Sequence, residues 1–161
     1  MKMSPEEYRE KLGAIVENFH ALEFLLRAFL QNQSTAKPLG VPPGTDIYTV
    51  PVGSILPENE LTSYDSLGTL IAKFNAVMAA VGQPTVDVTL VDVRDAIAHG
   101  RVSSRTKQGY LRLLKFDQPS SGNVRVVFNE EMNETWFKAE TERIWAAIEL
   151  VANNVGAKIE S

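Results

Sequence analysis

Apolar side chains recur every three or four residues in four stretches of the chain, residues 4–33, 63–81, 86–99 and 133–155. This spacing places them on one face of an α-helix. Between the last two stretches, residues 110–116 and 124–128 are short runs rich in valine, leucine and phenylalanine, which is typical of β-strands. The pattern predicts a mainly α fold, a four-to-five-helix bundle with a β-hairpin over residues 110–128 inserted before the last helix.

The first two helices carry recognisable start signals. Ser4 can cap the first helix, Pro5 suits its first position, and Glu7 completes a capping box. Either Thr62 or Ser63 is expected to cap the second helix, which Gly82 and Pro84 should end. Its buried stripe is expected to consist of Tyr64, Leu67, Ile71, Phe74, Met78 and Val81.

The third helix is expected to begin near Thr85 or Asp87 and to end at His99. Gly100 would then take the left-handed conformation common after a helix end. The last helix should begin between Asn129 and Asn133.

Residues 34–61 form a connection rich in proline and glycine, with a short extended piece expected at 47–52. A loop of this length inside a compact domain is often functional or mobile. At 161 residues, the chain (1–161) is expected to be a single helical domain.

Composition narrows the class of protein. The chain has 44% hydrophobic and 22% charged residues and no cysteine, which excludes disulfides and thiolate metal sites. No apolar run approaches the length needed to span a bilayer, and no signal-peptide region opens the chain. A cytoplasmic protein with no membrane partner is therefore expected.

The charge is unevenly distributed. The net charge of −4 argues against a general nucleic-acid coat protein. Between positions 94 and 115, however, one acid, Asp95, stands against six basic residues: Arg94, Arg101, Arg105, Lys107, Arg112 and Lys115. This local excess suits a phosphate-bearing ligand, although a solvated loop and hairpin would show the same pattern.

Three residues near the end of the third helix could carry chemistry. His99 can act as a general acid or base, and Asp95, four residues earlier, is placed to reach its imidazole. Arg94 brings a planar cation suited to phosphate. The alternative is a helix end at which His99 meets the helix dipole and pairs with Asp95 at the surface.

The third helix also has two apolar faces, since Val88, Val91 and Ala98 lie opposite its main apolar stripe. That main stripe consists of Val86, Leu90, Val93 and Ile97. A second copy of the chain could cover that other face. A central helix buried within one domain remains the alternative.

Glu17 and His20 have the spacing of a carboxylate–histidine metal motif. His99 is the only other histidine of the chain, and the residue three positions before it is Ala96 rather than a glutamate. The chain therefore lacks a second pair of this kind. No metal site is expected.

The segment Arg94-Asp95-Ala96-Ile97-Ala98-His99-Gly100 resembles the arginine–polar–x–x–x–histidine motif of the HEPN superfamily. The expected order of helices is also similar to that family, in which the motif ends a late helix and one more long helix follows.

The resemblance implies a metal-independent ribonuclease that acts as a homodimer with two motifs facing one cleft. Arg94 would bind the scissile phosphate, His99 would be the general acid or base, and Asp95 would orient the site. Arg101, Arg105 and Lys107 are the candidate substrate-binding residues, and no cofactor is expected. Family members include toxins and antiviral defence effectors, often with an antitoxin-type protein partner.

Two other functions stay open. One is a non-catalytic HEPN module that binds a nucleotide or a protein partner, since the family contains inactive members. The other is an unrelated helical interaction protein, in which Arg94 and His99 would point to solvent away from any cleft.

Overall fold

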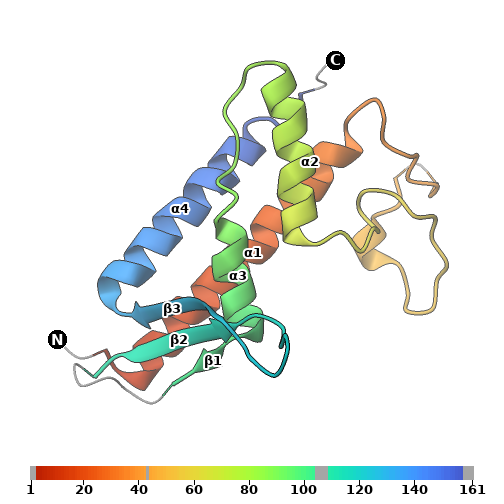
Figure 1. Ribbon diagram of the computed structural model, residues 1–161. Helices are drawn as coiled ribbons and strands as arrows, with labels where there is room; N and C mark the ends of the chain where they lie inside the picture. Colours follow the sequence, from red (N-terminus) through yellow and green to blue (C-terminus); the bar gives the residue numbers. More distant parts are fainter. Residues whose placement is uncertain (1–2, 43, 104–108, 158–161) are drawn as a thin grey trace. The chain divides into compact units, whose positions relative to one another are not determined.

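A computed structural model describes residues 3–42, 44–103 and 109–157 of the chain (Figure 1). It contains four α-helices, one short 3-10 helix and three β-strands within the described residues. In chain order these are α1 (Pro5–Gln31), η1 (Ile47–Thr49), α2 (Leu67–Ala80), α3 (Leu90–His99), β1 (Arg101–Val102), β2 (Leu111–Phe116), β3 (Val126–Met132) and α4 (Glu134–Ala152).

The fold is mixed rather than a clean helical bundle. The four predicted helices are present, and the predicted hairpin is confirmed as β2 and β3. The sheet has a third strand, however, because β1 pairs antiparallel with β2 and gives the order β1-β2-β3. A strand of two residues carries too little pattern to be recognised in a sequence.

The chain divides into two compact units: residues 1–22 with 87–149, and residues 23–86 with 150–161. The single domain expected for residues 1–161 stays a prediction.

In the first unit, the start of α1 is fixed as predicted. Ser4 Oγ accepts a hydrogen bond from the Glu7 amide at 3.1 Å, and the Glu7 carboxylate accepts one from the Ser4 amide at 2.6 Å. The Tyr8 hydroxyl then accepts a hydrogen bond from the Leu111 amide, which ties α1 to β2. The buried core of this unit is made of Met3, Tyr8, Ile15, Phe19, Leu22, Leu90, Val93, Ala96, Leu113, Met132, Trp136, Phe137, Ile144, Ala147 and Ile148.

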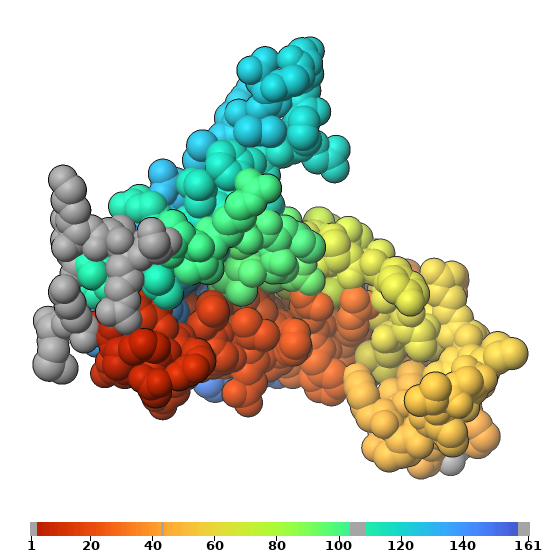
Figure 2. All heavy atoms as spheres, turned by 90° about the horizontal axis from the view of Figure 1, so that it is seen from below, coloured from red at the N-terminus to blue at the C-terminus, as the bar shows by residue number. Residues whose placement is uncertain are grey.

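The hairpin turn lies where it was predicted. Ser120 and Asn123 exchange two backbone hydrogen bonds, and both central residues have positive φ, 51° at Ser121 and 77° at Gly122. These are the signs of a type I′ turn, whose twist matches that of the strands it joins. The hairpin, in cyan in Figure 2, stands out from the rest of its unit. β3 runs to Met132, four residues beyond its predicted end.

In the second unit, α2 begins later than predicted. Ser66 is the capping residue, since its hydroxyl accepts a hydrogen bond from the Thr69 amide, and neither Thr62 nor Ser63 caps the helix. Tyr64, expected in the buried stripe, precedes the helix and is fully exposed. Leu67, Ile71, Phe74 and Met78 are buried as expected, whereas Val81 at the end of the stripe is exposed. Phe74 packs edge-on against Phe29 of α1 at 4.7 Å between ring centroids.

The 34–61 connection contains η1 where an extended piece was expected. Its end is held by Arg27, whose guanidinium donates to the backbone oxygens of Ser63 and Asp65. The loop nevertheless leaves Tyr48, Val52 and Ile55 exposed.

None of the helices that the structure describes combines the length and apolar character that crossing a bilayer requires.

Candidate functional site

The helix α3 carries the motif residues, and it begins at Leu90, later than predicted. The Asp87 carboxylate accepts hydrogen bonds from the amide and hydroxyl of Thr89, and the next amides bond three residues back. This side-chain turn competes with the α-helix and delays its first turn. Val88 therefore lies before the helix, exposed, rather than on its second apolar face.

The core face of α3 is confirmed in its main residues. Leu90 and Val93 are buried as expected, and Ile97 is half-buried. Ala96 is fully buried although the pattern did not place it on this face. Ala98 and His99 are exposed at the end of the helix.

Gly100 does not take the predicted left-handed conformation. Its φ of −77° and ψ of −177° are those of extended backbone. The residue is glycine for another reason: a Cβ here would collide with the Ala96 carbonyl oxygen and lie 3.0 Å from that of Leu114. Close approach to the last turn of α3, and in addition to β2, therefore requires the missing side chain.

Arg94 and Asp95 lie in contact on α3. Arg94 Nη1 is 3.4 Å from one carboxylate oxygen of Asp95, and Nζ of Lys115 in β2 is 3.5 Å from the other. All three side chains are partly exposed, so these are weak pairs. The carboxylate thus lies between two cations that come from different elements.

The expected contact between Asp95 and His99 is absent. Within the described part of the chain, His99 makes no hydrogen bond or ion pair, and Asp95 pairs with Arg94 and Lys115 instead. The imidazole is exposed to solvent, available to a ligand but not held by a neighbouring carboxylate.

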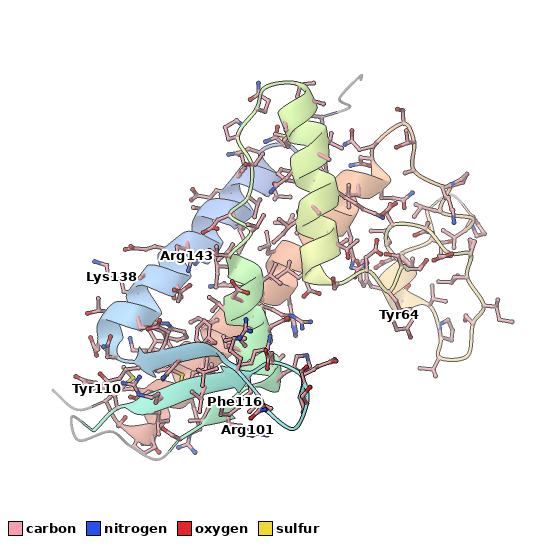
Figure 3. The ribbon with its side chains drawn as sticks, viewed as in Figure 1. Tyr64, Arg101, Tyr110, Phe116, Lys138 and Arg143 are labelled. Atoms are coloured by element: carbon pink, nitrogen blue, oxygen red, sulfur yellow. The ribbon has the colours of Figure 1, made fainter. Side chains whose placement is uncertain are left out.

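Of the predicted substrate-binding residues, the structure places Arg101 beside the motif. Arg101 belongs to β1, and its guanidinium carbon lies 5.2 Å from the centre of the Phe116 ring in β2 (Figure 3). Arg105 and Lys107 lie outside the described residues.

A hollow of about 170 Å³ lies between the end of α3 and the part of the hairpin next to its turn. Its lining residues are His99, Arg101, Leu114, Phe116, Asp117, Pro119 and Val124. Two larger hollows in the same unit, of about 620 and 350 Å³, include neither Arg94 nor His99 among their lining residues. The motif chemistry therefore adjoins the smallest of the three.

Lys115, Phe116 and Asp117 were not predicted as site residues. Alternation along β2 gives the available signal, because it turns Leu113 and Lys115 to one face and Leu114 and Phe116 to the other. That signal cannot tell which face meets the end of α3.

The pairing of Glu17 and His20 does not extend to a metal site. His20 is exposed on α1, and no group of three or more histidine, aspartate or glutamate side chains in the described ranges could hold a metal ion.

No protein-family model matches this chain, and neither a curated protein nor a solved structure matches it.

Proposed function

We propose that this protein is a metal-independent ribonuclease of HEPN type that acts as a homodimer. One observation carries the proposal: His99 is exposed at the end of α3 and lines a hollow together with Arg101, while Arg94 lies about one and a half turns earlier on the same helix. An imidazole that shares a hollow with an arginine side chain supplies two of the groups that phosphodiester cleavage uses.

In the proposed reaction, the RNA 2′-hydroxyl attacks the adjacent phosphorus and the bond to the 5′-oxygen breaks. His99 of one protomer takes the proton from the 2′-hydroxyl, and a protonated His99 of the partner gives one to the leaving oxygen. Arg94 binds a non-bridging phosphate oxygen. The products are a 2′,3′-cyclic phosphate end and a free 5′-hydroxyl end.

Asp95 is a positioning residue in this proposal. Its carboxylate contacts both Arg94 and Lys115 and so limits where the two cations can lie. A role in a toxin–antitoxin pair or in antiviral defence, with an antitoxin-type partner, rests on the resemblance of the motif alone.

The test is cleavage of an end-labelled, structured RNA in excess EDTA by wild type, His99→Ala and Arg94→Ala. General acid–base catalysis contributes about 100-fold or more, so each variant should lose at least that factor in rate. His20→Ala is the matched control, because His20 is the only other histidine and is exposed on α1. It should cleave at the wild-type rate.

Cleavage at equal rates by wild type and His99→Ala would show a contaminating nuclease and remove the proposal. Dependence of wild-type cleavage on added metal would remove its metal-independent mechanism.

A second candidate, a non-catalytic module that binds a nucleotide, is favoured by the missing Asp95–His99 hydrogen bond. An imidazole that no described side chain orients is poorly prepared for proton transfer. Saturable nucleotide binding without turnover of any RNA tested would select this function.

A further inference from the structure

The hollow beside His99 is large enough to bind one ring system. Sites for whole drug-sized ligands usually exceed about 300 Å³. This hollow, at about 170 Å³, is smaller and open to solvent. It can receive a flat group from a longer ligand whose remainder stays outside.

One wall of the hollow presents planar groups. Phe116 is half-buried in β2, the central strand, and the Arg101 guanidinium lies 5.2 Å from its ring centre. Aromatic rings and arginine guanidinium planes are the surfaces on which proteins stack nucleobases. Leu114 and Val124 add apolar lining around this pair.

Another wall carries the carboxylate of Asp117, which can accept a further hydrogen bond. One oxygen of Asp117 accepts a hydrogen bond from the Arg125 amide at 2.7 Å, and the Asp117 amide donates to the Arg125 carbonyl at 3.0 Å. These two bonds fix the residue close to the turn of the hairpin. The second carboxylate oxygen has no hydrogen-bond partner in the part of the chain that the structure describes.

The third feature is the position of His99, which lines the same hollow. A base seated against Phe116 would bring its own sugar-phosphate next to the imidazole. The hollow would thus bind the base of a nucleotide, and His99 would face the sugar-phosphate of the same nucleotide.

We infer that this hollow is a nucleobase-binding subsite, formed by Arg101, Phe116 and Asp117, that prefers a base with an exocyclic amino group over uracil. The inference rests on the proposed function in taking RNA as the ligand. Arg101 and Phe116 supply stacking, which every base accepts, whereas the free oxygen of Asp117 accepts a hydrogen bond from an amino group. Uracil presents a carbonyl oxygen where cytosine presents that amino group, and the carboxylate repels it.

The experiment is a calorimetric titration of the whole protein with cytidine 3′-monophosphate and uridine 3′-monophosphate. The two probes differ at position 4 of the ring, amino against carbonyl. Cytidine monophosphate should bind about tenfold more tightly than uridine monophosphate, as expected for one hydrogen bond to a base edge.

Two variants separate the contributions. Phe116→Leu keeps an apolar side chain but removes the ring, and should weaken both nucleotides about tenfold. Asp117→Asn keeps the oxygen that accepts from Arg125 but replaces the other by an NH₂ donor, and should reverse the preference in favour of uridine. Because Asp117 is exposed, this variant tests the preference even where Phe116→Leu lowers stability.

Equal affinity for the two nucleotides, or a preference that Asp117→Asn leaves unchanged, would overturn the inference. Neither result depends on cleavage, so the outcomes separate. Base-selective binding without turnover would support the subsite and contradict the ribonuclease. Cleavage that requires His99 but is unchanged by substitution of Phe116 or Asp117 would support the ribonuclease and contradict the subsite.

Discussion

Gly100 is the residue at which the chain passes from α3 to β1 with no room for a side chain. Its missing Cβ would meet two carbonyl oxygens, those of Ala96 and Leu114. Backbone atoms give way less easily than the ends of side chains, so Gly100→Ala must distort the last turn of α3 and crowd the carbonyl of Leu114 in β2. We expect the free energy of unfolding to fall by about 1–3 kcal/mol, measured by urea denaturation.

Gly13→Ala is the matched control for this substitution. Gly13 lies inside α1, is exposed, and has nothing within 4 Å of the added methyl group. Alanine is the better helix former there, so this variant should gain about 0.5–1 kcal/mol. If Gly100→Ala left the free energy of unfolding unchanged, the crowding of position 100 by the two carbonyl oxygens would be absent in solution.

The sequence pattern explained Gly100 by a left-handed conformation after the helix end, and that explanation was wrong. Glycine is selected both where φ is positive and where two backbones come close. A local pattern favours the first reason because helices commonly end that way. The second depends on the exact path of the chain past Ala96 and on Leu114, which lies fourteen residues further on and in another element.

At the level of elements, prediction succeeded where the start or end signal is local. The capping box at Ser4 and Glu7 and the turn at Ser121 and Gly122 need only their own neighbours. It failed where several similar signals compete. Three serines or threonines precede α2 closely enough to cap it, and packing of the helix selects Ser66.

The start of α3 is tied to α4 by one arginine. Arg143 donates to the Asp87 carboxylate at 2.8 Å, to the Thr89 hydroxyl, and to both oxygens of Glu140, which is buried (Figure 3). The hydrogen bond from Arg143 holds the pKa of Asp87 below its ordinary value of 3.8, against the opposing effect of burial.

Arg143→Leu should lower the free energy of unfolding by about 2 kcal/mol at neutral pH, because it leaves the Glu140 carboxylate without this donor. The pH dependence should change as well. A carboxyl whose pKa is lowered by folding contributes stability above its unfolded pKa, and that contribution disappears as the pH falls through the folded value. Between pH 6 and pH 2, wild type should therefore lose more stability than the variant, as measured by urea denaturation at each pH.

Lys138→Leu is the control on the same helix. Lys138 pairs with Glu142 at 3.8 Å, and both side chains are largely exposed. Its loss should change the free energy of unfolding by less than about 0.5 kcal/mol. Equal effects of the two substitutions would mean that the Arg143 network contributes no more than a surface ion pair.

At the scale of the whole molecule, the proposed ribonuclease is a dimer that brings two copies of α3 together. Ala98 is exposed and directly precedes His99, so it would lie close to the partner. We expect Ala98→Glu to shift sedimentation from dimer to monomer and to reduce RNA cleavage at least tenfold, since a charge desolvated in an interface is costly.

Ala79→Glu provides the comparison. Ala79 is exposed and is the last residue but one of α2, the position that Ala98 has in α3. Both variants carry the same unfavourable charge near a helix end, but only Ala98→Glu should dissociate the dimer. A wild-type protein that sediments as a monomer and still cleaves RNA would contradict the dimeric mechanism.

Only the residues of the candidate site that lie on α3 or closely follow it could be predicted from the sequence. Arg94 and His99 share a helix five residues apart, so the sequence predicts that both lie on α3 within about one and a half turns of its end. Lys115 and Phe116 come to the site through the pairing of β2 with β1 and its packing beside α3. Such long-range pairing leaves no periodic trace in the sequence.

The short length of β1 has a consequence for how long the hollow keeps its shape. Its two residues, Arg101 and Val102, are exposed and pair with one neighbour at the edge of the sheet, whereas Phe116 is half-buried and ends a strand of six residues that pairs with β3 along its length. Edge segments with few buried contacts open far more often than central strands. We therefore expect the Arg101 side of the hollow to open more often than the Phe116 side, so that a flat ligand could enter without unfolding of β2.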